Sequence, residues 1–351
     1  MRMQFLGRAT LFALAAVVGV GSWATGSARA GEEFKLLNVS YDPTRELYKE
    51  FNEVFAKYYR EKTGNTVTIT QSHAGSTAQA NAVIQGNEAD VLTLALAYDI
   101  DEVVNKTKAN GKQLLPENWQ SRLPKNSAPY TSTIVFLVRV GNPKNIKDWN
   151  DLTRSDVKTI TPDPKTSGGA RWNYLAAWAY ALANNGNDDA KAREFVKQIY
   201  ANVPVLDSGA RGATNTFVQK GQGDVLLAWE NEAYLSINDV AKGKVEIVVP
   251  SLSIRAEPTV TWVDKNVERH GTTEVAKEYL NYLYSKEGQR IAGKNYYRPS
   301  DPEVGKEFTD TLPELKLVTI DDDFGGWAKA YARHFADGAE FDQIITELHK
   351  K

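Results

Sequence analysis

The sequence predicts an α/β protein built from two lobes. Segments with helical periodicity alternate with short apolar segments of strand type along the chain, which is the pattern of α/β proteins. The chain has 351 residues, and at roughly 100 to 200 residues per domain this length favours two domains. Residues 83–94 and 217–229 share the order helix, glycine turn, Asp-Val and strand, which fits two similar lobes but is also common among unrelated α/β proteins.

Residues 1–30 have the pattern of a secretory signal peptide. Arg2 and Arg8 precede an apolar run over 9–20, and Ala28-Arg29-Ala30 is a small-x-small cleavage motif. The run is short for a membrane anchor, so we expect cleavage after Ala30 and export of the mature chain. The sequence has no cysteine, so the exported fold must be stable without disulfides.

The predicted elements of the mature chain begin with a helix over 45–62. Its apolar residues are spaced three and four apart, and Thr63-Gly64 ends it. Further elements are expected in the order strand 66–70, helix 76–85 and buried strand 90–96, and later a strand that ends at Trp229.

Two long strand-type segments, 132–140 and 245–252, bracket the middle of the chain. We see no low-complexity linker in the sequence, so we expect the chain to cross between the lobes at these segments, as paired hinge strands. The predicted second lobe is therefore 130–250. The predicted first lobe is discontinuous and combines 31–129 with 251–351.

The segment 165–172, Lys-Thr-Ser-Gly-Gly-Ala-Arg-Trp, leads directly into a helical pattern at 174–178. Ser167 is a suitable N-cap, and Gly168 and Gly169 leave the first backbone N–H groups of the helix uncovered. Such N–H groups bind an anion without any lysine or arginine. The segment therefore predicts a site for a small, fully ionised ligand.

Three further segments predict helix starts of the same kind. Asp42 precedes proline as an N-cap, Ser76 follows glycine before an alanine-rich helix, and 208–212 precede a helix expected at 215–220. Each alone is explained by simple capping. Together, three helix N-termini that converge on one cleft would supply on the order of +1.5 charges. Trp229, at a strand end, adds an indole N–H that can only donate.

These segments resemble the periplasmic sulfate-binding proteins of ABC uptake systems, which are two-lobed solute-binding proteins of type II. The resemblance covers essentially the whole mature chain. The matching stretches are 38–48, 71–76, 94–101, 164–178, 205–216, 228–232, 297–299 and 324–327. One departure is Ala74, where the family leads us to expect glycine in a His-Gly-Gly-Ser run.

The resemblance implies a fold of two lobes joined by two hinge crossovers, each lobe a mixed sheet flanked by helices. It also implies that a sulfate dianion is buried between the lobes and held by uncharged donors. Carried onto this sequence, the ligand-binding groups are the backbone N–H groups of Asp42, Ser76, Gly168, Gly169 and Ala210, the hydroxyl of Ser167 and the indole N–H of Trp229.

A site made only of donors discriminates between anions by protonation. Sulfate carries no proton at neutral pH, whereas the O–H of a protonated phosphate would face donors and stay unpaired at a cost of about 1–3 kcal/mol. We therefore expect the Asp42 carboxylate to face away from the ligand and to cap its own helix or pair with Arg45 or Arg211. Thiosulfate, chromate, selenate, molybdate and tungstate are alternative ligands that the sequence does not separate from sulfate.

By the same resemblance, we expect a periplasmic monomer without cofactor or catalytic activity. Ligand binding would close the hinge, and the closed form would deliver sulfate to an inner-membrane permease driven by a separate ATPase, as a step in sulfate transport and sulfur assimilation. The chain itself has no Gly-x-x-x-x-Gly-Lys phosphate loop.

Other classes of function are disfavoured by the sequence. His73 lies near Ser76, but neither Ser76 nor Ser167 stands in the Gly-x-Ser-x-Gly motif of a hydrolase nucleophile. The histidines are scattered and cysteine is absent, which disfavours a transition-metal site, and we expect 321–323, three aspartates, to cap a helix. The formal net charge of −2 disfavours a nucleic-acid partner.

Overall fold

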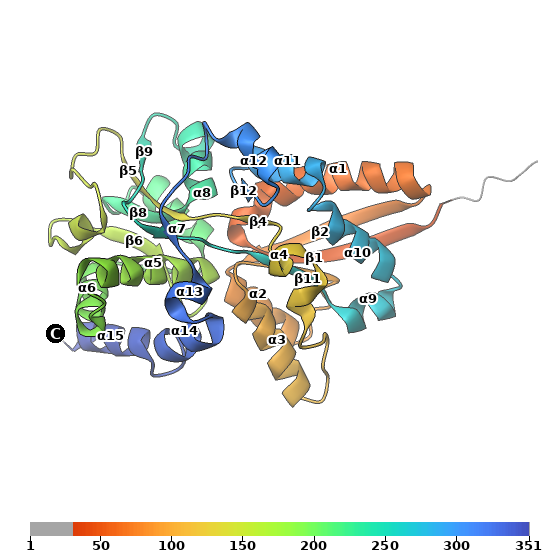
Figure 1. Cartoon of the computed structure of the whole chain (residues 1–351), viewed down its shortest axis with the longest axis horizontal. Coiled ribbons are helices and arrows are strands. Elements are labelled where there is room, and N and C mark those ends of the chain that lie inside the picture. The colour runs from red at the N-terminus through yellow and green to blue at the C-terminus, as the bar shows by residue number, and fades with distance from the viewer. Residues whose placement is uncertain (1–30, 351) are drawn as a thin grey trace, which may run out of the picture.

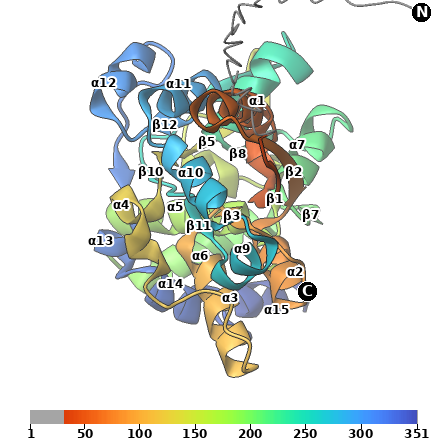
Figure 2. The ribbon, with the colours of Figure 1, turned by 90° about the vertical axis from the view of Figure 1, so that its right-hand side faces the viewer.

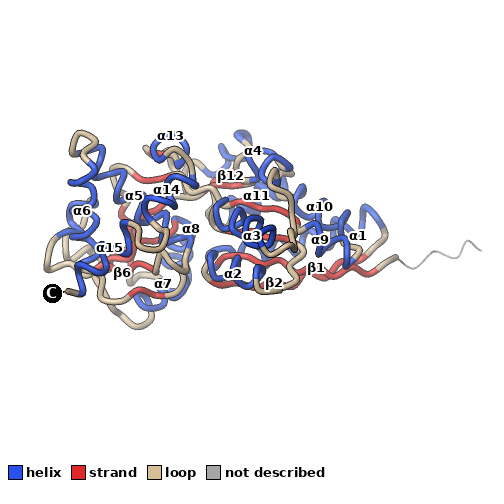
Figure 3. Tube along the Cα trace, turned by 90° about the horizontal axis from the view of Figure 1, so that it is seen from below, coloured by secondary structure: helices blue, strands red, loops and turns tan. Residues whose placement is uncertain are grey.

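The computed structural model describes residues 31–350, so the predicted signal peptide at 1–30 lies outside the described residues. Two separate β-sheets form the centres of two lobes that lie side by side (Figure 1, Figure 3). Within residues 31–350, no helix has the length and apolar character needed to cross a membrane.

The first lobe contains a four-stranded sheet. Its strands are β1 (Glu33–Tyr41), β2 (Thr66–Ala74), β3 (Val91–Leu94) and β11 (Thr259–Trp262), in the order β11-β3-β1-β2. Its helices are α1 (Arg45–Thr63), α2 (Ser76–Ile84), α3 (Ala97–Ala109), α4 (Pro124–Ser127), α9 (Asp264–His270), α10 (Thr273–Tyr282), α11 (Lys286–Lys294) and α12 (Pro302–Gly305). Figure 2 shows α1 and α11 on one side of the sheet and α2 and α3 on the other.

The second lobe contains a five-stranded sheet. Its strands are β5 (Ile134–Arg139), β6 (Thr159–Pro162), β7 (Leu206–Asp207), β8 (Val225–Trp229) and β9 (Val245–Val248), in the order β7-β6-β8-β5-β9. Its helices are α5 (Gly168–Asn184), α6 (Asp189–Ala201), α7 (Ala210–Val218) and α8 (Glu230–Leu235), together with α13 (Ile320–Phe324), α14 (Trp327–His334) and α15 (Glu340–His349).

Short helical turns complete the two lobes. The 3-10 turns lie at Asp42–Thr44, Trp119–Arg122, Trp149–Thr153 and Lys306–Phe308, and a π-helical turn lies at Ser236–Val240.

The two sheets share one arrangement. In each, three parallel strands adjoin one antiparallel strand: β2-β1-β3 lie beside β11, and β7-β6-β8 lie beside β5. The segments with internal sequence similarity form α2–β3 and α7–β8, which occupy equivalent positions in the two lobes. The prediction of an α/β fold with a mixed sheet flanked by helices in each lobe is confirmed.

Helix α1 shows how the apolar spacing places the core. Its buried face packs against the first sheet, and burial of each large apolar side chain contributes about 1.5–3 kcal/mol. The helix ends at Gly64, whose φ of 77° and N–H bond to the Arg60 carbonyl form a left-handed cap. The predicted helix over 45–62 and its end at Gly64 are confirmed. The residues of the buried face include Leu47, Tyr48, Phe51, Phe55 and Tyr59.

The chain passes between the lobes next to the two predicted hinge segments. Ser132 and Ala256 lie side by side there and exchange two backbone hydrogen bonds of 2.9 Å each. Strand β4 (Tyr130–Thr131) pairs with β12 (Arg298–Pro299) beside them. A third passage, which the sequence analysis missed, runs through β13 (Leu317–Val318), which pairs with β10 (Ser253–Ile254).

The third passage carries the C-terminal helices to the second lobe, beneath α5 and α6 in Figure 1. Trp327 of α14 packs edge-on against Trp172 of α5, with ring centroids 4.7 Å apart. Arg193 of α6 pairs with Glu347 of α15 at 2.8 Å. The assignment of 251–351 to the first lobe is therefore wrong for these helices. Helix α5 is buried along most of its length, so the face turned away from the sheet needs this cover.

His334 is buried where α14 packs on α5. Its Nδ1 lies 3.3 Å from the Tyr174 hydroxyl, and its ring meets the ring of Trp178 at a centroid distance of 4.5 Å. Burial lowers the pKa of His334 to about 3, and the positive charge of Arg333 acts in the same direction. The imidazole is therefore neutral in the folded protein at physiological pH.

We expect the His334 imidazole to remain neutral in the folded protein from pH 8 down to pH 5. An unfolded histidine titrates near 6.5, so as the pH falls from about 6.5 to 3 the unfolded state takes up the proton first. This residue then lowers the free energy of unfolding by up to about 1.4 kcal/mol per pH unit. NMR of the imidazole signals as a function of pH measures the protonation of His334, and the His334→Gln variant assigns its signal. The same titration in concentrated urea is the control for the unfolded state. Titration of the folded signal near pH 6.5 would contradict the prediction.

Candidate functional site

The candidate site lies where the carboxyl ends of parallel strands from the two sheets face each other. In the first lobe, the chain turns after β1 through Asp42–Thr44, and it enters α2 after β2. In the second lobe, it enters α5 after β6 and α7 after β7, and Trp229 ends β8. Ligands of α/β proteins collect at such strand ends, because helix N-termini present free N–H groups there.

The two lobes approach each other closely at glycines. A Cβ added to Gly168 would lie 3.0 Å from the Cβ of Ser76, and one added to Gly209 would lie 2.3 Å from Oδ2 of Asp42. Only hydrogen atoms fit at these points. The structure therefore brings the seven predicted site residues to one boundary between the lobes: Asp42, Ser76, Ser167, Gly168, Gly169, Ala210 and Trp229.

Ser167 is the N-cap of α5, as predicted. Its Oγ accepts a hydrogen bond from the backbone N–H of Ala170 at 3.3 Å, so its own O–H hydrogen is left to donate elsewhere. The N–H groups of Gly168 and Gly169 belong to the first turn, where helix geometry offers no intrahelical acceptor. One buried helix thus presents three donors at the same end.

Trp229 supplies a buried donor from β8. Its side chain is 2% exposed, and its indole Nε1 has no hydrogen-bond acceptor among residues 31–350. A Cβ added to Gly169 would lie 2.5 Å from this Nε1. The ring of Tyr41 packs against the indole, with centroids 5.2 Å apart, and limits its orientation. A buried donor without a partner costs about 1–3 kcal/mol, so an acceptor on a ligand at this position would remove that cost.

Two predicted caps differ in the structure. Asp42 begins the 3-10 turn, and its carboxylate makes no cap bond. It pairs instead with Arg45 at 2.7 Å, which was the expected alternative to capping. Ser76 is the first residue of α2, with Gly75 as N-cap, and its hydroxyl donates to Asp99 at 2.5 Å. Charge-assisted bonds of this kind are stronger than neutral cap bonds. Both backbone N–H groups still lie at helix starts.

Two details of the loops also differ from expectation. Helix α7 begins at Ala210, with Gly209 as its N-cap, and not at the predicted 215–220. The Ala210 N–H is therefore itself in the first turn. Ala74, where the family pattern predicted glycine, is the last residue of β2 and thus in extended backbone that any residue adopts.

A buried ion pair supports the site from behind, and the sequence analysis missed it. Arg171 of α5 donates to Asp99 of α3 at 2.9 Å, and their side chains are 3% and 1% exposed. Asp99 also accepts from the hydroxyls of Ser76 and Thr77 at the start of α2. The signal was present, because Arg171 is the one charged residue of the apolar α5 and a buried arginine needs a carboxylate partner.

Other cations beside the site are paired as well. Arg211 binds Glu46 of the first lobe at 2.9 Å and Glu232 of the second at 2.8 Å, and Arg298 binds Glu230 at 2.7 Å. Burial raises the pKa of Glu232 above its ordinary value, against the opposing charge of Arg211. These pairs leave backbone dipoles as the main positive field at the boundary.

His73, the candidate catalytic base if the protein were a hydrolase, has hydrogen-bond partners other than Ser76. His73 Nδ1 lies 3.1 Å from the Tyr41 carbonyl, and Nε2 lies 2.6 Å from the Gln71 amide oxygen. The Ser76 hydroxyl binds Asp99 and accepts from the Ala95 N–H. The two side chains therefore do not form the hydrogen-bonded nucleophile and base that such catalysis requires.

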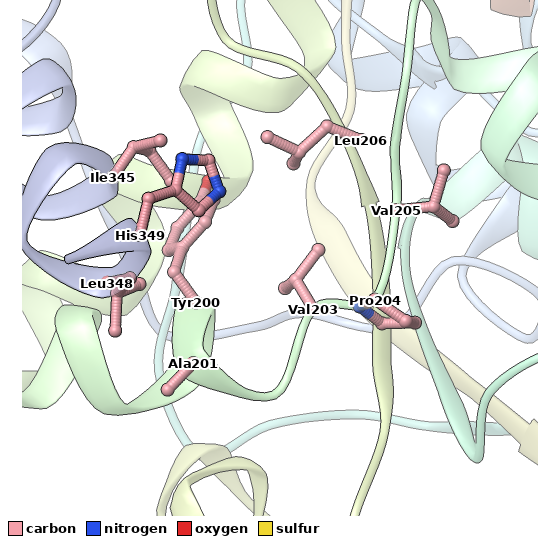
Figure 4. A pocket seen from close by; sticks show the side chains of 9 residues that line it. All are labelled: Tyr200, Ala201, Val203, Pro204, Val205, Leu206, Ile345, Leu348 and His349. Atoms are coloured by element: carbon pink, nitrogen blue, oxygen red, sulfur yellow. The ribbon is translucent and has the colours of Figure 1, made fainter. Parts of the chain in front are cut away.

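A separate hollow of about 420 Å³ lies at the far end of the second lobe, between α6 and α15 (Figure 4). Most of its lining side chains are apolar, and none of its lining residues belongs to the candidate site. Its lining residues are Tyr200, Ala201, Val203, Pro204, Val205, Leu206, Ile345, Leu348 and His349.

The chain matches the family model described as bacterial extracellular solute-binding protein over residues 41–298. It is 60% identical to the sulfate-binding protein of Escherichia coli (strain K12) over 327 residues, 93% of this chain and 98% of that protein. It is 47% identical to the thiosulfate-binding protein of Pseudomonas aeruginosa over 332 residues, 95% of this chain and 98% of that protein. The solved structure of the sulfate-binding protein SubI from Mycobacterium tuberculosis H37Rv aligns with a TM-score of 0.75 and 30% identity, covering 86% of this chain and 99% of that one.

We expect the Asp42–Arg45 pair to stabilise the fold. Asp42→Asn removes the charge of a largely buried carboxylate, so the free energy of unfolding at pH 7 should fall by about 1–3 kcal/mol. Urea unfolding followed by circular dichroism measures this change. Asp310→Asn, at an exposed position, is the matched control and should stay within about 0.5 kcal/mol of wild type. Equal changes in the two variants would speak against the prediction.

Proposed function

The chain belongs to the bacterial extracellular solute-binding protein family, and we propose that it binds sulfate in the periplasm and delivers it to an inner-membrane ABC permease with a separate ATPase. The 60% identity to a protein named for sulfate binding supports sulfate over thiosulfate, whose named relative is 47% identical. The role is binding and delivery by a monomer rather than catalysis. Export would follow from the predicted cleavage after Ala30.

The observation that carries the proposal is the buried indole N–H of Trp229, which lies without an acceptor beside the N-terminus of α5. A sulfate oxygen would supply that acceptor. The proposed ligand-binding groups are the N–H groups of Asp42, Ser76, Gly168, Gly169 and Ala210, the Ser167 hydroxyl and the Trp229 indole. A hydrogen bond to a charged partner contributes about 1.5–3 kcal/mol, so seven donors are ample for micromolar or tighter binding after dehydration and closure.

Donor-only chemistry accounts for discrimination against phosphate. The Asp42 carboxylate, which adjoins the site, is paired with Arg45 through Oδ1, and its Oδ2 lies beside Gly209. We therefore expect this carboxylate to stay paired with Arg45 and to accept no hydrogen bond from the ligand. The O–H of a monoprotonated phosphate would remain unpaired, whereas every oxygen of sulfate is an acceptor. For the same reason Asp42→Asn should change sulfate affinity much less than stability.

Closure of the lobes would complete the site. Donors of the first lobe come from Asp42 and Ser76, and the rest come from the second lobe, so neither lobe alone surrounds the anion. The ligand then favours the closed state through the contacts that it makes only there. The pairs Arg171–Asp99 and Arg211–Glu46 join the lobes beside the site and stabilise the same state.

Calorimetric titration of the mature, ligand-stripped protein with sulfate tests the function. We expect tight one-to-one binding of sulfate and rejection of phosphate at the same pH and salt. Competition with thiosulfate and molybdate then determines the preferred anion. Absence of oxyanion binding in a demonstrably folded sample would exclude the proposed site.

We expect Trp229→Phe to weaken sulfate binding by about 10- to 150-fold, because it removes one hydrogen bond to a charged ligand while it keeps an aromatic ring. Calorimetry or competition measures the dissociation constant. Trp119→Phe is the matched control, since it removes an equally buried indole N–H that binds Asp101 at 2.9 Å within the first lobe. The control should lose stability but keep its affinity, and a shared loss of affinity would contradict the role of Trp229.

We expect Gly168→Ala to weaken sulfate binding by at least about 10-fold. Its Cβ would lie 2.9 Å from the Cβ of Ala95 and from Cδ2 of Leu96, so the first lobe must move away by several tenths of an ångström. Hydrogen bonds weaken quickly over such distances. Gly305→Ala adds the same methyl group to a helix where the nearest atom is 4.0 Å away, and it should bind like wild type.

A further inference from the structure

We propose that Tyr98 and Tyr331 form an aromatic clasp between the lobes, and that this clasp sets how tightly and how long sulfate is held. The inference rests on the sulfate function proposed above. Tyr98 lies at the start of α3 in the first lobe, whereas Tyr331 belongs to α14, which packs on the second lobe. Their rings are stacked, with centroids 3.9 Å apart and planes inclined by 18°.

Helix α14 is attached to the second lobe at both ends. Trp327, its first residue, packs edge-on against Trp172, and His334, its last residue, lies against Tyr174. Tyr331 lies between these two anchors and contacts the opposite lobe. The Tyr98–Tyr331 stack must therefore separate if α3 and α14 move apart with their own lobes.

The stack is also displaced from the hinge. Trp327 lines a small hollow together with Ala128 and Thr259, which lie close to the segments that pass between the lobes. Tyr331 is four residues further along α14, about 6 Å along the helix axis. The stack therefore lies about one helical turn beyond the residue of α14 that lines this hollow.

The clasp is continuous with groups that support the ligand. The Tyr331 ring centre lies 5.1 Å from the guanidinium carbon of Arg171, and Arg171 pairs with Asp99, the residue after Tyr98. Asp99 holds the hydroxyl of Ser76, whose backbone N–H is a proposed sulfate donor. The aromatic contact and the anion site therefore depend on the same closed arrangement.

Sulfate affinity and dissociation rate test the clasp. An aromatic pair of this kind corresponds to about a 2- to 10-fold change in an equilibrium constant. We expect Tyr98→Ala and Tyr331→Ala each to weaken sulfate binding by that factor and to raise the dissociation rate constant similarly. Because both variants break one contact, the double variant should be weakened by less than the product of the two single effects.

Two matched controls separate the clasp from a general loss of packing. Tyr331→Phe keeps the ring and should keep wild-type affinity and dissociation rate. Tyr282→Ala breaks the Tyr58–Tyr282 stack, whose ring centroids are 4.3 Å apart and which lies within the first lobe. This second control should lose stability without losing affinity.

Wild-type affinity in folded Tyr98→Ala and Tyr331→Ala overturns the clasp, and so do independent, multiplicative effects in the double variant. If the wild-type protein itself fails to bind sulfate, the proposed function fails instead. Small-angle X-ray scattering then tests the clasp on its own. A larger radius of gyration in Tyr331→Ala than in wild type and Tyr331→Phe supports it, and equal radii overturn it.

Discussion

The arrangement of this protein depends on helix N-termini from two lobes meeting at one place, with glycines at the points of closest approach. Gly168 approaches Ser76 and Gly209 approaches Asp42 so closely that a single Cβ would intrude. Backbone N–H groups can reach a buried anion only under this condition, because they have no flexible stem. The strand order of each sheet places these helix starts at strand ends that face each other, so it meets the same need for close approach of the backbone N–H groups.

The pairing of nearby cations follows from this constraint. Arg45, Arg171 and Arg211 all lie near the site, and each pairs with a carboxylate. A free arginine there would bind phosphate as readily as sulfate, since both are anions. With the side-chain charges neutralised, the field comes from oriented amides that do not titrate. In the proposed site, the ligand would then be distinguished by whether it carries a proton.

The local features of the site could be predicted from the sequence, but its long-range partners could not. The segment Ser167-Gly168-Gly169 predicts a helix start with uncovered N–H groups, because capping by serine and the lack of a glycine side chain act within a few residues. The partner of Ser76 is Asp99, at the start of another helix, so the cap expected at Ser76 was wrong. Likewise, the apolar face of α15 predicts burial but does not indicate which lobe it covers. That choice depends on α5, whose side away from the sheet would otherwise be exposed.

The return of the C-terminal helices to the second lobe also changes the hinge. Because α13–α15 lie there, the chain must pass between the lobes a third time, through a strand paired with β10. Adjacent, hydrogen-bonded passages of this kind suit the hinge rotation that we propose for closure of the lobes. Each lobe then keeps its donors in place before the ligand arrives. Affinity therefore depends on how far closure is favoured, and contacts distant from the anion can tune it.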